Sequence, residues 1–131
     1  MMRTLQPAGW VRPRGYSNGI EAEGRVILVA GQIGWNENGE FHEHTLGGQF
    51  RQALKNVLSV LKEANAGPEH IGRMTMFVTS REEYVATRPQ LGEAWKELMG
   101  KTFPAMAVII VTGFVEPEAK IEIEATAVLP R

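Results

Sequence analysis

The strongest constraint on the fold is the stretch 120–129, in which apolar and polar side chains alternate strictly. One face would carry Ile121, Ile123, Ala125, Ala127 and Leu129, and the other Lys120, Glu122, Glu124 and Thr126. A period of two is typical of a β-strand with one buried face and one open face. We therefore predict a strand over residues 120–129 that packs on a core along one face.

A second apolar run lies just before it, at residues 105–115, and is rich in β-branched side chains. A nearly continuous run of this kind predicts a strand that is buried on both faces. The segment between the two runs contains Pro117, which cannot donate to a sheet ladder and so favours a turn. The two runs are expected to form a β-hairpin.

Residues 1–14 contain prolines and glycine without a periodic pattern, which predicts an irregular segment. Arg12 and Arg14 lie in this segment. They are either solvated charges or an anion-binding edge beside Tyr16. Sequence alone leaves both interpretations open.

Residues 16–23 and 25–33 have the composition of two strands, and Gly24 between them suits a tight hairpin. Gly31 interrupts the second strand pattern. A glycine in such a position indicates a bulge or a close approach of a backbone or ligand.

Two helices are predicted in the middle of the chain. Thr45 can cap a helix that runs through Ala64 with one apolar stripe. Residues 73–79 read as a strand, and capping boxes at residues 80–83 and 87–90 predict a short turn followed by a helix to Met99. The element order predicts an α+β fold, with a single mixed β-sheet and two helices packed on one face.

Composition limits the classes of function. The chain has 131 residues, 14 basic and 15 acidic side chains and no cysteine, so we expect one domain over residues 1–131 without disulfides. No run of like charge suggests a nucleic-acid or membrane partner. No signal-peptide pattern or membrane span is recognisable, and we expect a cytoplasmic protein.

We expect neither a cofactor nor a metal ion. Glu40, His42 and His44 would share one face of an extended segment, which raises the possibility of a metal site. The sequence offers no further anchored ligand for it, so a surface loop is the better interpretation.

Four motifs, in order along the chain, resemble the RidA superfamily of reactive intermediate deaminases, formerly called YjgF. The last of them, the C-terminal signature, consists of two parts. FPAMAVIIV and KIEIEATAV resemble the family's C-terminal signature, F/Y-P-A-R-x-x-V followed by V/I-E-I-E-A-x-A-V. GYSNGI, VAGQIG and RMTMFVTS resemble the G-P-Y-S-Q, V-S-G-Q-I-P and K-x-T-V-F-V segments. The family's arginine is Met106 in this chain, and the serine that usually precedes Gly31 is Ala30. The chain thus resembles an arginine-lacking branch.

The resemblance implies a chorismate-mutase-like subunit in a homotrimer, with small-molecule sites in clefts between subunits. By position, Glu122 matches the glutamate that holds the attacking water, and Tyr16 matches a tyrosine of the pocket wall. The backbone at Gly31 and Ala105 would bind polar atoms, and Met106 would shape the pocket with Tyr16. Without the resemblance, Glu122 would read as part of a solvent-exposed face.

The resemblance implies a hydrolase of imines or enamines, of the 2-iminobutanoate/2-iminopropanoate deaminase type. Methionine cannot form the bidentate contact by which arginine holds a carboxylate, so an altered substrate range is expected. Arg12, Arg14 or Arg88 could replace that contact. The alternative is a non-enzymatic metabolite binder or sensor with the same cleft. Ribonuclease activity is the least supported, because no basic stripe or aromatic platform is apparent.

Overall fold

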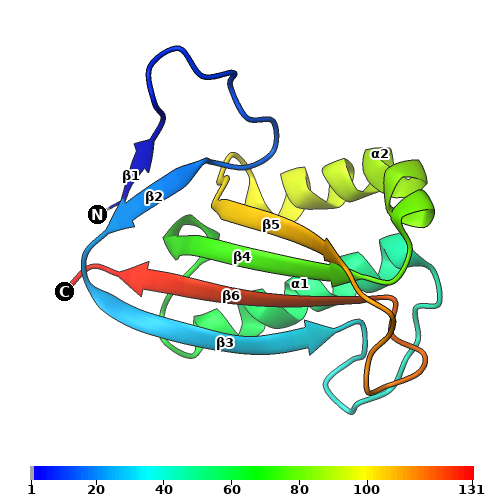
Figure 1. Cartoon of the computed structure of the whole chain (residues 1–131). Helices are drawn as coiled ribbons and strands as arrows, with labels where there is room; N and C mark the ends of the chain where they lie inside the picture. Colours follow the sequence, from blue (N-terminus) through cyan, green and yellow to red (C-terminus); the bar gives the residue numbers. More distant parts are fainter. Residues whose placement is uncertain (1) are drawn as a thin grey trace.

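The computed structural model describes residues 2–131 (Figure 1). The elements are β1 Met2–Leu5, β2 Gly19–Ala22, β3 Arg25–Ile33, α1 Leu46–Lys62, the 3-10 turn η1 Pro68–His70, β4 Ile71–Val78, α2 Arg81–Met99, β5 Ala105–Ile110 and β6 Ile121–Leu129. The predicted α+β class, with a mixed sheet and two helices, is confirmed.

A four-stranded sheet in the order β3-β6-β4-β5 forms the body of the molecule. β4 and β5 run parallel, whereas β6 is antiparallel to both of its neighbours. Both helices lie behind this sheet in Figure 1. In the described residues the other face of the sheet carries no helix, so the sheet has one covered face and one open face.

β6 confirms the alternation in the sequence. Ile121, Ile123, Ala125 and Ala127 are buried under the helices. Glu122 and Glu124, which alternate with them, lie on the open face. Because β6 is a central strand, its inward residues form the middle of the core.

The first helix begins as predicted. The Thr45 side chain accepts a hydrogen bond from the Gly48 amide at 3.0 Å, which satisfies one of the free N–H groups of the first turn. The helix ends at Lys62 rather than Ala64. Its apolar stripe includes Phe50 and Leu54, which are fully buried against the sheet.

The second helix is one continuous element, so the predicted start near Thr87 is wrong. Ser80 caps the helix by accepting a hydrogen bond from the Glu83 amide at 3.1 Å. Thr87 lies inside the helix, and its hydroxyl donates a hydrogen bond to the Glu83 carbonyl at 2.6 Å. Pro89 also lies inside the helix. Packing of the inward side chains against the core outweighs the local signal for a break. The helix stops at Gly100, whose φ is 63°.

The predicted hairpin between residues 105–115 and 120–129 is wrong. β5 is the edge strand beside β4, and β6 is inserted between β3 and β4. Strand 105–115 is also shorter than predicted and is not buried on both faces. β5 ends at Ile110, which is 50% exposed, and Val115 is 99% exposed. An edge strand with one open face buries less of its apolar surface than a central strand does.

The N-terminal segment differs from its prediction as well. Within residues 1–14, of which Met1 lies outside the described part, β1 forms a two-stranded antiparallel sheet with β2. β2 and β3 do not form the predicted hairpin. β2 pairs with β1 in the small sheet, and β3 pairs with β6 in the larger one. Gly24, between β2 and β3, has a φ of 150°, and a Cβ there would lie 2.9 Å from the carbonyl carbon of Leu129. Glycine is required at this crossing, where β2 leaves the plane of the larger sheet.

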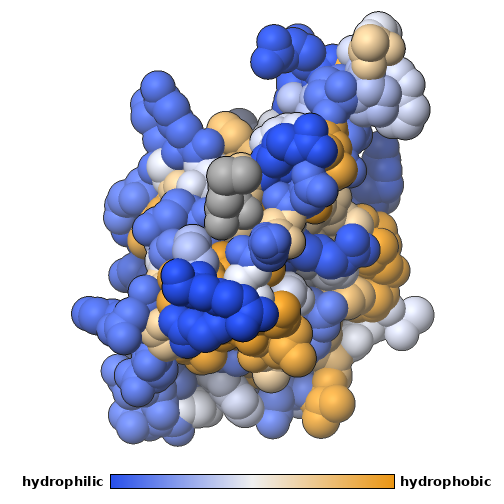
Figure 2. Space-filling model, turned by 90° about the vertical axis from the view of Figure 1, so that its left-hand side faces the viewer, coloured by the Kyte–Doolittle hydropathy of each residue, from blue (hydrophilic) through white to orange (hydrophobic). Residues whose placement is uncertain are grey.

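No helix in the described part of the chain is both long enough and apolar enough to cross a membrane. Figure 2 shows the side of the molecule that carries the two termini, where hydrophobic atoms reach the surface between charged side chains.

Candidate functional site

A bulge in β3 lies beside Glu122. Val29 pairs with Ala125, but the next paired residue of β3 is Gln32, opposite Ile123. Two residues of β3, Ala30 and Gly31, therefore oppose a single residue of β6, which is a β-bulge as predicted. The Gln32 amide group donates a hydrogen bond to the Ala30 carbonyl at 3.1 Å. The bulge removes backbone groups from the ladder, and both of its residues are exposed.

Gly31 touches the Glu122 side chain directly. A Cβ at Gly31 would overlap the Glu122 carboxylate, with its carboxyl carbon at 2.7 Å. Any other residue would displace that carboxylate from its position, so the predicted close approach at Gly31 is present within one chain. Glu122 itself is half-buried. A carboxylate beside free backbone groups can hold a water molecule between them.

Gln49 of α1 anchors the chain just before β6. Its side chain is 1% exposed, and its oxygen accepts a hydrogen bond from the Lys120 amide at 2.8 Å. Its nitrogen donates to the carbonyls of Glu118, at 3.0 Å, and Glu43, at 3.1 Å. Gln49 thereby sets where β6 begins and hence where Glu122 lies. Sequence analysis missed this residue, because a glutamine on a helix gives no sign of burial.

Tyr16 and Met106 meet at a second place, a pocket on the helix-covered side of the sheet. The pocket lies between β5, α2 and the segment that contains Tyr16, and it has a volume of about 880 Å³. Met106 pairs with the buried Met74 of β4, and so it faces the helices. Tyr16 and Met106, which the resemblance assigns to one pocket wall, both line this hollow.

Ala105 links the Tyr16 segment to β5. Ser17 forms an isolated parallel bridge with Ala105. The Ser17 amide donates to the Pro104 carbonyl at 3.0 Å, and its hydroxyl donates to the Phe103 carbonyl at 2.5 Å. These bonds hold the backbone beside Tyr16 on the start of β5, next to Met106.

The five predicted residues thus form two groups that lie apart in one chain. One group is Gly31 with Glu122, and the other is Tyr16, Ala105 and Met106. Glu122 lies opposite Phe77 of β4, whereas Met106 lies opposite Met74. Three positions along a strand correspond to about 10 Å, and the two side chains also point to opposite faces of the sheet. Within residues 2–131, Glu122 and Met106 therefore lie on opposite faces of the sheet.

Sequence analysis also missed the role of α2 in the pocket. Tyr84, Arg88, Gly92 and Lys96 line it and follow one another at intervals of four residues, so they share one face of the helix. The spacing is visible in the sequence, but the predicted break at residues 87–90 separated Tyr84 from the others. Arg88 lies 5.8 Å from the centre of the Tyr84 ring.

The Tyr84 phenol stays neutral at pH 7. Burial raises the pKa of Tyr84, and the nearby charge of Arg88 lowers it by less. The phenol consequently brings no negative charge into the pocket to neutralise Arg88.

The segment with Glu40 and His42 is a surface turn. Asn36 accepts hydrogen bonds from the amides of Asn38 and Glu40, and Glu40 lies 3.6 Å from His42. The hydrogen bond from Asn36 and the one from His42 lower the pKa of the Glu40 carboxyl. Within residues 2–131 no group of three potential metal ligands is gathered, and His44 belongs to a different hollow.

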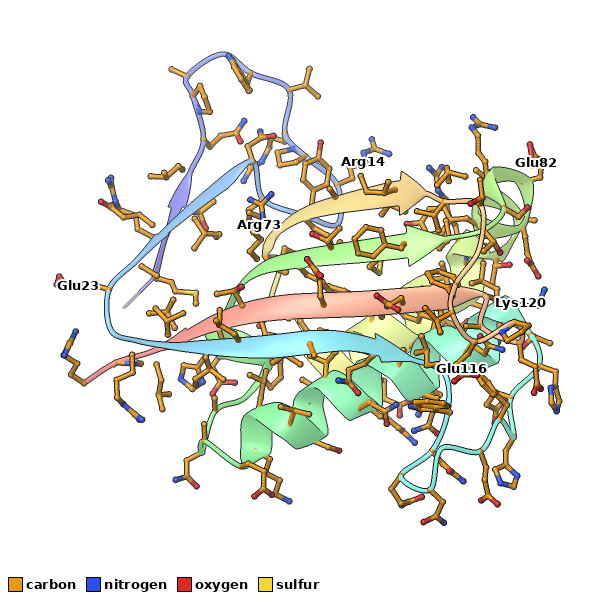
Figure 3. The ribbon with its side chains drawn as sticks, turned by 60° about the horizontal axis from the view of Figure 1, so that its bottom comes forward. Arg14, Glu23, Arg73, Glu82, Glu116 and Lys120 are labelled. Atoms are coloured by element: carbon orange, nitrogen blue, oxygen red, sulfur yellow. The ribbon has the colours of Figure 1, made fainter. Side chains whose placement is uncertain are left out.

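Figure 3 places several charged side chains around the sheet. Arg14 lies beside β5, and Arg73 lies toward the end of the sheet where β5 begins. Glu82 and Lys120 lie at the opposite end. Lys120 is 3.2 Å from Glu83 in an ion pair, so its charge is neutralised there.

Comparison with known proteins identifies related chains across nearly the whole sequence. The family described as endoribonuclease L-PSP matches residues 11–129. A RutC family protein of Pasteurella multocida is 31% identical over 106 residues, covering 80% of this chain and 81% of that protein. The 2-iminobutanoate/2-iminopropanoate deaminase of Escherichia coli is 32% identical over 113 residues, or 86% of each chain.

Solved structures agree with these relatives. The Rid-family protein YyfB of Yersinia pestis has a TM-score of 0.84 and 32% identity, with 98% of each chain covered. A member of the YjgF/YER057c/UK114 family from Mycobacterium tuberculosis has a TM-score of 0.65 and 27% identity over 88% of each chain. On the sequence match and the shared fold together, the chain belongs to the RidA/YjgF superfamily, to which the endoribonuclease L-PSP family model corresponds.

Proposed function

We propose that the protein hydrolyses an imine or enamine of a small metabolite, in a cleft that a neighbouring copy of the chain completes in a homotrimer. Membership of the RidA/YjgF superfamily supports this reaction class, and one relative is a 2-iminobutanoate/2-iminopropanoate deaminase. The altered pocket at Met106 is the reason to expect a substrate range different from that of the relative.

The observation that carries the proposal is the contact between the Glu122 carboxylate and Gly31 at the bulge. In the proposed reaction, a water held there forms a bond to the imine carbon and gives a proton to Glu122. That proton then passes to nitrogen and gives a carbinolamine. When the carbon–nitrogen bond breaks, the hydroxyl proton also moves to nitrogen by way of Glu122, so that ammonia and a carbonyl compound leave. An enamine would first take the imine form.

A neighbouring chain is part of the proposal for two reasons. Tyr16 and Met106 lie on the other side of the sheet from Glu122, so a cleft that uses all three needs surfaces from two chains. The open face also exposes Val26 and Leu28 of β3, at 63% and 76%. Large apolar side chains in such a position favour burial against another subunit.

Replacement of the carboxylate tests the reaction. Glu122→Gln is expected to lower imine hydrolysis by about 10² to 10⁴, because an amide cannot take the proton from water. Glu124→Gln is the matched control, since it removes the next carboxylate on the same face of β6. The measurement is the rate of 2-oxo acid formation from a series of imines generated in situ. Equal losses in both variants would contradict the assignment of Glu122.

A second candidate function is a metabolite binder without turnover. One observation favours it: no carboxylate lines the pocket that contains Tyr16 and Met106. In that case every imine of the series would decay at the rate of the uncatalysed reaction, while ligands would still bind to the pocket.

A further inference from the structure

The pocket beside α2 has an apolar floor. Phe50, Met76, Leu91, Trp95, Met106 and Val108 all line it. Its volume, about 880 Å³, falls in the range of roughly 300 to 1,000 Å³ that is typical of small-molecule sites. Such a floor suits a hydrocarbon or aromatic group rather than a small hydrated acid.

The rim of the same pocket is cationic. Arg14, Arg88, Lys96 and Lys101 line it, and no aspartate or glutamate does. In the described part of the chain none of these four side chains forms an ion pair. Glu97, an acid of the same helix, is instead paired with Arg51. The rim therefore presents unneutralised positive charge to whatever enters the pocket.

Gly92 is the uncharged small residue on the face of α2 that lines the pocket. It lies on α2 midway between Arg88 and Lys96, which are about 12 Å apart along the helix axis at 1.5 Å per residue. A Cβ at Gly92 would have no atom within 4 Å, so packing does not require glycine there. Glycine inside a helix is less favourable than alanine. Its presence between two cations leaves a gap through which a ligand can reach the floor.

We infer that this pocket binds an amphipathic organic anion, with its carboxylate between the cations of the rim and an apolar or aromatic body on the Met106 floor. The cations offset the cost of removing the carboxylate from water, and Arg88 can hold it through two parallel N–H groups. As the substrate class of the enzyme, the inference rests on the proposed function. Binding itself requires neither turnover nor Glu122.

Trp95 provides a direct test, because its ring is part of the floor. Trp10 and Trp35 would be replaced by phenylalanine, so that tryptophan fluorescence reports on Trp95 alone. The probes are 4-phenylbutyrate, its neutral amide 4-phenylbutyramide, and acetate, which has no apolar body. We expect saturable quenching by 4-phenylbutyrate, with binding weaker by about 10-fold or more for the amide and for acetate.

Three variants separate the pocket from general effects. Arg88→Gln is expected to weaken 4-phenylbutyrate binding by about 10-fold, as is typical when a charge-assisted hydrogen bond is lost. Arg81→Gln makes the same change in charge on the first turn of the helix, outside the pocket, and should leave binding unchanged. Gly92→Phe should abolish binding by closing the mouth while the circular dichroism spectrum stays that of the parent.

Several results would overturn the inference: equal affinity for the acid and the amide, equal losses in Arg88→Gln and Arg81→Gln, or unchanged binding in Gly92→Phe. A change of oligomeric state in Gly92→Phe would also do so, because it would identify the occupant as a second copy of the chain. Failure of the inference remains distinct from failure of the proposed function. Glu122→Gln should lose hydrolysis but keep 4-phenylbutyrate binding, whereas Gly92→Phe should lose both.

Discussion

Met106 sets the chemical character of the pocket floor, since it sits on β5 among other apolar side chains and faces the helices. A thioether is flexible and polarizable, so it can adapt to apolar ligands of different shape. It offers no charge to a small acid that has little apolar surface. The residue therefore favours larger ligands over small ones.

Met106→Arg is expected to reverse this preference. A guanidinium on the floor would form charge-assisted hydrogen bonds with a short 2-imino acid, raising its rate of hydrolysis by about 10-fold to 100-fold. The same charge should weaken 4-phenylbutyrate binding, because the apolar body would have to pack on it. Met106→Leu is the control and should leave both properties near those of the parent. The measurements are 2-oxo acid formation and Trp95 quenching. A rise in both the rate of hydrolysis and the affinity for 4-phenylbutyrate would contradict the argument.

At the scale of elements, the position of Glu122 depends on how α1 holds the start of β6. Gln49 joins the two through three backbone groups, those of Glu43, Glu118 and Lys120. These groups are held beside a fully buried side chain, so each would lose its partner if Gln49 were truncated.

Gln49→Ala is expected to lower the free energy of unfolding by about 3 kcal/mol, because unsatisfied buried groups cost roughly 1–3 kcal/mol each. Gln52→Ala, on the same helix, removes only a hydrogen bond to Asn56 and should cost less than about 1 kcal/mol. Urea denaturation measures both values. Faster hydrogen exchange at the Lys120 amide would locate the effect, and an unchanged exchange rate there would speak against this anchoring role.

At the scale of the molecule, one face of the sheet lacks a cover. The helices bury the other face along β6 from Ile121 to Ala127, whereas β3 leaves Val26 and Leu28 exposed on the open side. The proposed homotrimer would bury this surface and would bring a second chain close to Glu122.

Leu28→Arg should convert the trimer into monomers, because a charge cannot be buried in such an interface without a partner. Val60→Arg, on the exposed side of α1, is the control. Light scattering should give three times the mass of one chain for the parent and for the control. The Leu28→Arg monomer should lose imine hydrolysis but retain 4-phenylbutyrate binding, since the pocket lies within one chain. A monomeric parent would refute the interface model.

The sequence determined the features that depend on neighbours along the chain. The alternation at residues 120–129 predicted the buried face of β6, Thr45 marked the start of the first helix, and Gly31 indicated the bulge. These follow from backbone geometry and local hydrogen bonding, which act over a few residues. The four family segments likewise carried the superfamily assignment.

Only the tertiary structure decided which strands pair and which side chains share a site. Insertion of β6 between β3 and β4 could not be inferred, because pairing buries apolar surface between segments far apart in sequence and a hairpin satisfies the same local pattern. The same step put Glu122 and Met106 on opposite faces of one sheet. It also brought Arg14 from the N-terminal segment and Arg88 from α2 to the rim of one pocket, although the two residues lie far apart along the chain. Charge and apolar surface from distant segments combine only when the chain is folded, and that combination decides what the pocket can bind.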